Sequence, residues 1–89
     1  MEIHYSKKFQ KNFKKRILPN SSLEQRFKER FAIFIQDKTV PVLKDHKLIG
    51  KLQSYRAFSI TGDVRVVYFE ESNSAVTVID IGTHNQVYK

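Results

Sequence analysis

Cysteine is absent from this 89-residue sequence, which excludes disulfide bonds, thiolate zinc sites and thiol catalysis. Because small secreted domains usually depend on disulfides, the absence favours a cytoplasmic protein. No apolar run approaches the roughly 20 residues that span a bilayer, and the polar residues 1–4 are not typical of a signal peptide. Since ordinary domains contain roughly 100–150 residues, we expect residues 1–89 to form one domain.

The motifs of common enzyme classes are missing as well. The sequence contains no Gly-rich phosphate loop, no H-E-x-x-H and no G-x-S-x-G. Its three histidines and its dispersed aspartates lack the spacing of metal ligands, so we expect neither a metal nor another cofactor. Candidate chemistry therefore rests on polar residues at strand ends and turns.

Negative charge is scarce and unevenly distributed. The whole chain has 16 Lys and Arg against 9 Asp and Glu, a net charge of +7. Residues 1–30 hold nine basic and three acidic side chains, or +6, and residues 31–89 hold seven and six, or +1. This excess favours a polyanionic partner such as nucleic acid or an acidic protein, and a solvated helix face is the competing interpretation.

The first part of the chain has the pattern of a short strand, at residues 3–5, followed by two helices. Ser6 is a candidate N-cap, and the apolar stripe after it has a spacing of four: Phe9, Phe13 and Ile17. Residues 19–20 break this helix. Ser21 and Glu24 fit a capping box for a second helix that extends to about residue 37. Its apolar residues also recur at helical spacing: Leu23, Phe27, Phe31, Phe34 and Ile35. The two aromatic stripes predict a helical hairpin that packs on a common core.

From Pro41 onward the hydrophobic period changes to two. We expect strands at residues 55–60, 64–69 and 75–81, with turns at 61–63 and 71–74. Gly82 ends the last strand, and residues 83–89 form a short tail. The strands form an antiparallel meander to which the N-terminal strand adds at an edge. With two helices on one face, the predicted fold class is α+β.

Two segments of the second half combine basic or acidic side chains with loops and turns. In the loop at residues 44–51, His46 could transfer a proton while the lysines around it hold phosphates: Lys44, Lys47 and Lys51. A solvated loop is the alternative. Asp63 lies in the predicted turn at 61–63, where Asp is simply a favoured turn residue.

Arg65 interrupts a run of valines in a predicted central strand, and Arg56 lies one strand earlier. An Arg among buried neighbours needs an anionic partner. That partner is either a substrate phosphate or an internal carboxylate, such as Asp63 or Asp80.

His84 follows the end of the last predicted strand, and Tyr88 comes four residues later. An imidazole and a phenol presented to one cleft would suit phosphodiester chemistry, in which one group removes a proton and another supplies one. Packing of Tyr88 with Val87 against the core is an equally good explanation.

These short motifs occur in the order of a known family. A basic helical hairpin is followed by Lys-Asp-His-x-Leu-x-Gly at residues 44–50, Tyr-Arg, a Gly-Asp turn, Arg-Val-Val-Tyr, and Gly-Thr-His-x-x-x-Tyr at residues 82–88. Over essentially its whole length, the chain resembles the RelE/YafQ family of type II toxin–antitoxin toxins. The resemblance implies two N-terminal helices on a small curved antiparallel sheet. It also implies a ribosome-dependent, metal-independent endoribonuclease, or mRNA interferase, that inhibits translation.

In this family the ribose 2′-OH attacks the adjacent phosphate, which leaves a 2′,3′-cyclic phosphate and a 5′-OH. The resemblance assigns His84 the role of general acid, Arg65 the stabilisation of phosphate charge, and Tyr88 the orientation of the RNA. His46 and Asp63 match a loop histidine and a turn aspartate, and either could be the general base. Lysines 44, 47 and 51 and Arg56 are the expected RNA contacts.

The sequence also departs from the YafQ-like branch. Ser59 replaces a second histidine, Ala57 replaces its acidic neighbour, and Val64 replaces an aromatic residue. The departures at Ser59 and Ala57 support one alternative, a degenerate member with only an antitoxin-binding or regulatory role. A second alternative is a ParE-like toxin that inhibits DNA gyrase without nuclease activity, and the retained candidate catalytic residues argue against it. Under either toxin interpretation, the protein partner is a small and acidic cognate antitoxin.

Overall fold

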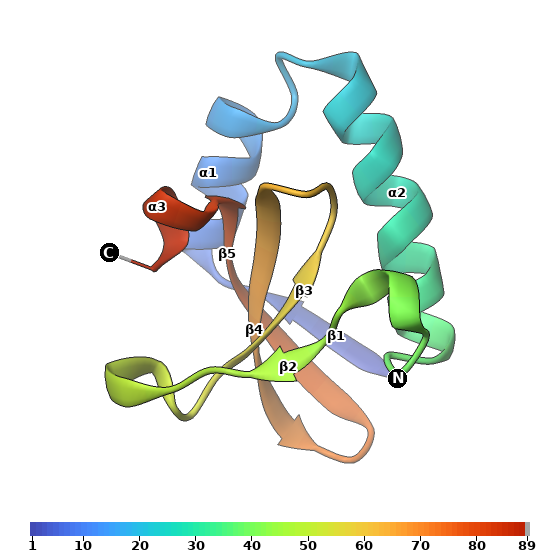
Figure 1. Ribbon diagram of the computed structural model, residues 1–89, viewed down its shortest axis with the longest axis vertical. Coiled ribbons are helices and arrows are strands. Elements are labelled where there is room, and N and C mark those ends of the chain that lie inside the picture. The colour runs from blue at the N-terminus through green and yellow to red at the C-terminus, as the bar shows by residue number, and fades with distance from the viewer. Residues whose placement is uncertain (89) are drawn as a thin grey trace.

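Residues 1–88, which the computed structural model describes, form a five-stranded sheet with two long helices packed on one face (Figure 1). The elements in chain order are β1 (Glu2–Tyr5), α1 (Lys7–Arg16), α2 (Ser21–Gln36), the 3-10 turn η1 (Pro41–Leu43), β2 (His46–Lys47), the 3-10 turn η2 (Gly50–Leu52), β3 (Arg56–Ser59), β4 (Val64–Ser72), β5 (Ala75–Thr83) and α3 (His84–Val87). This arrangement confirms the predicted α+β class. None of the described helices is both long and apolar enough to cross a membrane.

The strand order is β1-β5-β4-β3-β2, and the antiparallel meander of β3, β4 and β5 is confirmed. The N-terminal strand adds at an edge, as expected, but β1 pairs with β5 in parallel, with Ile3 opposite Val76. Antiparallel neighbours are joined by hairpins, whereas the chain leaves β1 through helices that cross the face of the sheet. The sheet is therefore mixed.

Both long helices begin at side-chain caps. Ser6 is the predicted N-cap of α1: its Oγ accepts a hydrogen bond from Phe9 N–H (3.0 Å) and donates one to the carbonyl of Ile79 in β5 (2.8 Å). The predicted capping box at Ser21 was wrong. Asn20 has the extended backbone of an N-cap, and its Oδ1 accepts from Ser22 N–H at 3.0 Å.

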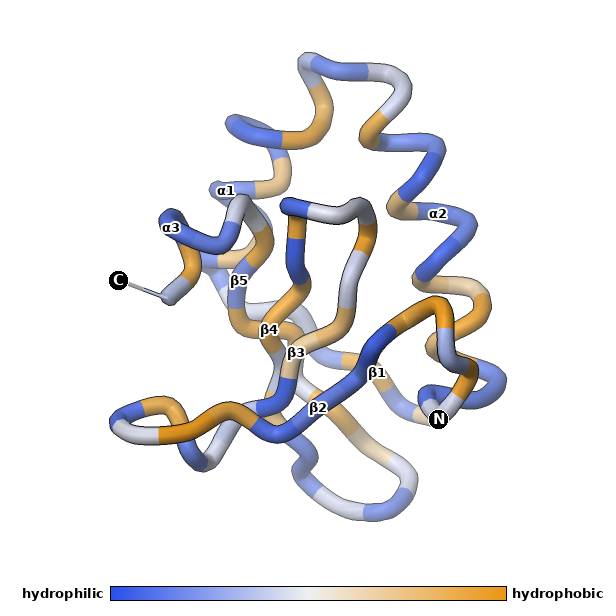
Figure 2. Tube along the Cα trace, in the orientation of Figure 1, coloured by the Kyte–Doolittle hydropathy of each residue, from blue (hydrophilic) through white to orange (hydrophobic). Residues whose placement is uncertain are grey.

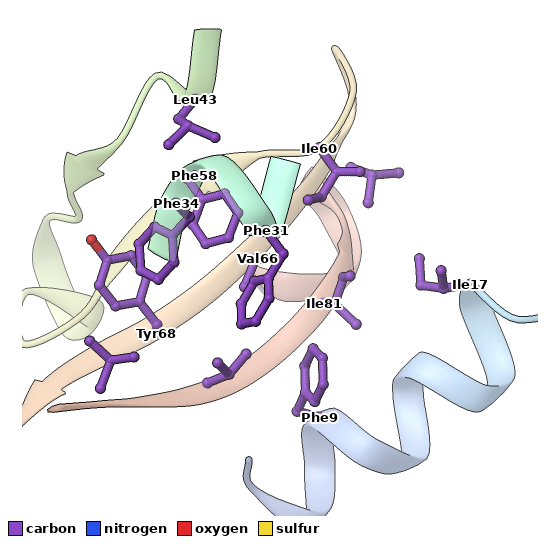
Figure 3. Close-up of a cluster of buried hydrophobic side chains, with 13 residues drawn as sticks. Phe9, Ile17, Phe31, Phe34, Leu43, Phe58, Ile60, Val66, Tyr68 and Ile81 are labelled. Carbon is purple, nitrogen blue, oxygen red and sulfur yellow. The ribbon is translucent and has the colours of Figure 1, made fainter. Parts of the chain in front are cut away.

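Aromatic rings fill the space between the helices and the sheet, as the predicted stripes indicated (Figure 3). Phe34 of α2 stacks on Phe58 of β3, with ring centroids 4.3 Å apart. Phe13 of α1 meets Phe27 of α2 edge to face at 4.9 Å. These contacts fix both helices to the same face of the sheet, and the opposite face remains free for other segments.

A smaller apolar cluster lies on that opposite face. Leu48, Ala57 and Val67 are buried there, and residues from β5 and the C-terminal segment pack against them. Leu48 belongs to the loop that follows β2, and Figure 2 shows this loop as an apolar stretch in front of the sheet. The cluster holds the loop and α3 on the same side of the molecule.

The C-terminal segment differs from the predicted tail. Thr83 and Gln86 form a capping box, in which Gln86 Oε1 accepts from Thr83 N–H at 2.8 Å, and this box starts the short helix α3. β5 extends through Gly82 to Thr83, so Gly82 does not end the strand. Residue 89 of the predicted tail lies outside the described residues.

A buried carboxylate attaches the basic helix α1 to β5. Asp80 is 3% exposed, and its Oδ1 accepts hydrogen bonds from Asn12 Nδ2 (2.7 Å) and Ile81 N–H (2.8 Å). The charged ends of Lys8 and Arg16 each lie 3.6 Å from this carboxylate. Asp80 is therefore occupied by α1 and does not pair with Arg56 or Arg65.

Removal of the Asp80 carboxylate is expected to destabilise the whole fold. Asp80→Ala leaves the amide of Asn12 and the N–H of Ile81 without their acceptor, which should lower the free energy of unfolding by about 2–4 kcal/mol. Urea denaturation measures this, with Glu29→Ala on the exposed side of α2 as a control that should change stability by less than about 0.5 kcal/mol. Equal stability of the two variants would contradict this account of how α1 is held.

Candidate active site

A groove of about 390 Å³ lies on the face of the sheet away from the helices. One wall comes from β2 and the loop after it, and the other comes from α3 and the residue that follows (Figure 1). We call this the histidine groove, and its lining residues are His46, Lys47, Leu48, Ile49, Leu52, His84 and Tyr88. Three of the five predicted catalytic residues therefore line one cavity.

His46 is exposed, and a main-chain hydrogen bond orients its ring. Its Nδ1 lies 2.8 Å from the carbonyl oxygen of Lys44. Because a carbonyl oxygen can only accept, Nδ1 carries the hydrogen. In the neutral ring, Nε2 then has a free lone pair, which a general base requires.

The loop before His46 is anchored by a carboxylate that is 4% exposed. Asp45 accepts hydrogen bonds from Arg56 Nε (2.8 Å) and Nη2 (2.7 Å) and from Tyr68 Oη (2.5 Å). The internal partner of Arg56 is thus Asp45, and the expectation of Asp63 or Asp80 was wrong. Two strands of the sheet fix the residue next to His46.

The contacts around Asp45 also shift the pKa values of Tyr68 and Arg56. Burial, followed by the hydrogen bond and the charge of Asp45, raises the pKa of Tyr68 above its ordinary range. Burial alone would lower the pKa of Arg56, but the hydrogen bonds and charges of Asp45 and Tyr68 outweigh it, so the net shift is upward. The phenol stays protonated and the guanidinium charged, which keeps the cluster intact at neutral pH.

His84 and Tyr88 lie next to each other across one turn of α3. Their rings meet edge to face, with centroids 4.5 Å apart. Tyr88 Oη is buried and has no hydrogen-bond partner within residues 1–88. Burial raises the pKa of Tyr88, and the positive charge of Arg65 nearby opposes that rise in part. A phenol hydroxyl with free bonding capacity thus stands beside an imidazole and an arginine.

Arg65 stands in β4 with its positive charge uncompensated by carboxylates. Its Nη1 donates to the carbonyl oxygens of Thr61 (3.3 Å) and Gly62 (3.2 Å) in the turn before β4. Within residues 1–88 it forms no ion pair, so neither Asp63 nor Asp80 is its partner. The guanidinium keeps donors for an anion next to Tyr88.

A main-chain hydrogen bond links Asp63 to His84. The carbonyl oxygen of Asp63 accepts a hydrogen bond from His84 N–H at 3.2 Å. Its side chain is exposed, and Asp63 is not among the lining residues of the histidine groove. Of the two candidate bases, only His46 lines the histidine groove.

The predicted RNA-binding lysines are all exposed, but only Lys47 lines the histidine groove. Lys51 lies in η2, and Lys44 lines a separate hollow beside α2. Sequence reasoning missed the apolar wall formed by Leu48, Ile49 and Leu52. Ile49 is 89% exposed, and the apolar pair Leu48-Ile49 between Lys47 and Lys51 was the available signal.

Two residues that differ from the YafQ-like branch lie on the same face. Ala57 is buried opposite His46 in the pairing of β2 with β3, and Ser59 is buried opposite Arg65 in the pairing of β3 with β4. Within the described part of the chain, no three His, Asp or Glu side chains are grouped so that they could hold a metal ion.

The solved structures that share this fold include bacterial toxins. The chain superposes on YafQ in the E. coli DinJ-YafQ complex with a TM-score of 0.81 and 22% identity, covering 99% of this chain and 98% of that one. For a copper-bound point mutant of a Helicobacter pylori toxin, the TM-score is 0.75 and the identity 25%, with 98% of each chain covered. A YoeB/ParE toxin from Agrobacterium tumefaciens gives 0.78 at 16% identity, covering 94% and 99%.

The family is shown by the sequence itself. The model of the YafQ family, described as a bacterial toxin of the type II toxin-antitoxin system, matches residues 1–89. The chain therefore belongs to the YafQ family of type II toxins. No curated protein matches it significantly.

The raised tyrosine pKa values predict a loss of stability in alkali. Above pH 10, near the pKa of an unfolded tyrosine, the unfolded chain releases protons that Tyr68 and Tyr88 retain in the folded protein. The free energy of unfolding should therefore be unaffected by these groups below about pH 10. Above it, the loss should approach about 1.4 kcal/mol per pH unit for Tyr68, and Tyr88 should contribute in the same direction.

Urea denaturation between pH 7 and pH 12 tests this linkage. Tyr68→Phe should cost about 1–3 kcal/mol at pH 7, because Asp45 loses a donor, and should flatten the alkaline slope. Below pH 9 the profile of the variant should run parallel to that of the wild type. An unchanged alkaline slope in Tyr68→Phe would contradict the assigned shift.

Proposed function

We propose that this toxin is a metal-independent endoribonuclease that cuts mRNA on the ribosome. The observation that carries the proposal is the convergence of His46 and His84 on one groove from distant segments of the chain. Membership of the YafQ toxin family supports the same conclusion. The groove is open, and its apolar wall at Ile49 offers a surface for a nucleobase.

The proposed reaction is an internal transfer of the phosphodiester. A base on the protein removes the proton of the ribose 2′-OH, and O2′ forms a bond to the phosphorus. The bond between phosphorus and O5′ breaks, and an acid on the protein supplies a proton to O5′. The products are a 2′,3′-cyclic phosphate and a 5′-OH, and one proton enters and one leaves the enzyme in each turnover.

In this scheme His46 is the base and His84 is the acid. The hydrogen bond from Nδ1 of His46 to the carbonyl of Lys44 leaves Nε2 free to accept the 2′-OH proton. Asp63 is the less favoured base, because its side chain does not line the groove. In each turnover His46 takes up the proton of the 2′-OH, and His84 gives one to O5′.

Arg65 and Tyr88 stabilise the charge that develops on the phosphate. The guanidinium has donors beyond those used by Thr61 and Gly62, and the phenol hydroxyl is unpartnered within residues 1–88. Lysines 44, 47 and 51 add attraction for the RNA backbone. Because Arg56 is held by Asp45, it is proposed to position His46 and to contact RNA only through its exposed part.

The proposed partners follow from charge and from the family. The exposed lysines of α1 suit ribosomal RNA, since phosphate contacts dominate such binding. YafQ of E. coli forms a complex with DinJ, and we propose an acidic cognate antitoxin for this chain as well. A ribosome-bound substrate places the protein in the cytoplasm.

Substitution of either histidine should abolish most of the cleavage. In a mixture of purified protein, programmed ribosomes and mRNA, His84→Ala and His46→Ala should each slow cleavage by about 10²–10⁴-fold, and Arg65→Ala by a similar factor. His4→Ala is the matched control: it removes an exposed histidine on β1 that pairs with Glu2, and it should cut like the wild type.

Several results would contradict the proposal. Intact mRNA with the wild-type protein would exclude the nuclease, and undiminished cutting by the two groove variants would exclude the site. Inhibition of DNA supercoiling by gyrase, without RNA cleavage, would favour the ParE-like alternative, and neither activity would favour the regulatory one.

A further inference from the structure

A second hollow, of about 220 Å³, lies between α2 and the turn that joins β3 to β4. We call it the cation groove. Three of its lining side chains are basic, Arg26 and Arg30 from α2 and Lys44 from the loop after η1. The remaining lining residues are Val42 of η1 and the polar or small residues Ser59, Thr61 and Gly62 of the β3–β4 region. No acidic side chain is among the described residues that line it. A hollow of this composition suits an oxyanion such as a phosphate.

The three basic side chains of the cation groove have few charge-neutralising contacts within residues 1–88. Arg26 Nε lies 3.7 Å from Glu29 Oε1, and both side chains are about half exposed, so solvent screens this pair. Arg30 donates one N–H to a neutral acceptor, the carbonyl oxygen of Val42, at 3.2 Å. Lys44 forms no ion pair within residues 1–88. Because a guanidinium has five N–H donors, both arginines keep donors for a ligand.

The backbone at Lys44 adds a separate indication. Lys44 has a φ of 50°, the only positive φ of a residue other than glycine within residues 1–88. A long side chain in this left-handed conformation costs about 1 kcal/mol or more, and such strain is concentrated at functional positions. The conformation places the lysine at the cation groove while its carbonyl oxygen holds His46.

The cation groove and the histidine groove have no lining residue in common, but Arg65 in β4 has contacts on the side of each. Ser59 lines the cation groove and lies opposite Arg65 in the pairing of β3 with β4. Gly62 also lines it, and its carbonyl oxygen accepts from Arg65. The charge of Arg65 in turn acts on Tyr88 of the histidine groove. Arg65 therefore lies between residues of the cation groove, on one side, and Tyr88 of the histidine groove, on the other.

We propose that the cation groove binds a backbone phosphate of the substrate RNA, next to the phosphate that is cut. This inference rests on the proposed function and adds a subsite to it. An extended single strand carries a phosphate at every nucleotide, so a strand with its scissile phosphate near Arg65 passes a neighbouring phosphate to Arg26, Arg30 and Lys44. The subsite fixes the position of the strand relative to His46 and His84.

The test measures RNA binding apart from cleavage. Isotope-labelled protein carrying His84→Ala, which keeps the RNA intact, is titrated with a short single-stranded RNA and separately with inorganic phosphate, and amide signals are followed by NMR. We expect the signals of Ser59 and Gly62 to shift with both ligands. Arg26→Gln should weaken RNA binding about tenfold, and the slope of log K against log salt should become shallower by about 0.7.

Two matched controls separate a subsite from general charge attraction. Lys28→Gln removes the same charge from α2 outside the cation groove and should change affinity by less than about twofold. An added Cβ at Gly62 meets no atom within 4 Å, so Gly62→Glu and Gly62→Gln should both fold. Only the glutamate should reduce binding strongly, because it places a like charge beside the phosphate.

Each outcome decides the proposal. Equal weakening by Arg26→Gln and Lys28→Gln, or shifts with phosphate but not with RNA, would overturn it. So would equal binding by the two Gly62 variants. Cleavage by the wild type with an unaffected KM in Arg26→Gln would leave the proposed function standing without the subsite. Binding that depends on Arg26 in a protein that cuts no RNA would instead refute the proposed function.

Discussion

The buried carboxylate of Asp45 is the contact on which the geometry of the histidine groove depends. It joins a loop to two strands, through two nitrogens of Arg56 and the hydroxyl of Tyr68. A carboxylate that is 4% exposed is tolerated only when such donors surround it. Leu43 before Asp45 and Leu48 after it pack in the two apolar clusters, and the Asp45 carboxylate fixes the residue next to His46. The position of His46 therefore depends on a buried charge as well as on apolar packing.

The two faces of the sheet differ in composition. The face under α1 and α2 is filled with stacked rings, such as Phe34 on Phe58, and its burial provides most of the hydrophobic stabilisation of the fold. The other face has a thinner apolar cluster and carries polar groups from β2, β4 and α3. Because alternate residues of a strand point to opposite faces, Val66 packs in the core while Arg65 next to it lies on the opposite face.

Local patterns in the sequence were enough for most of the fold. Phenylalanines spaced by helical turns predicted both helices and their common core, and Ser6 predicted a cap. The errors arose where a long-range contact decided the outcome. Asp45 lies between Lys44 and His46 and looks like part of a solvated loop, and its burial follows only from the approach of Arg56 and Tyr68. The parallel entry of β1 also depends on a distant strand.

The position of β5 in the sheet determines how late in its synthesis the chain can complete its fold. β5 pairs with β1 on one side and β4 on the other, and α1 is attached to it through Asp80. The bond from Ser6 to Ile79 spans 73 positions of the chain. Closing so long a segment is entropically costly and slow. The early elements β1 and α1 therefore reach their final contacts only after the late strand β5 is available. His84 and Tyr88 come later still, and a chain under synthesis therefore carries no complete groove until those residues have been added and β5 has joined the sheet.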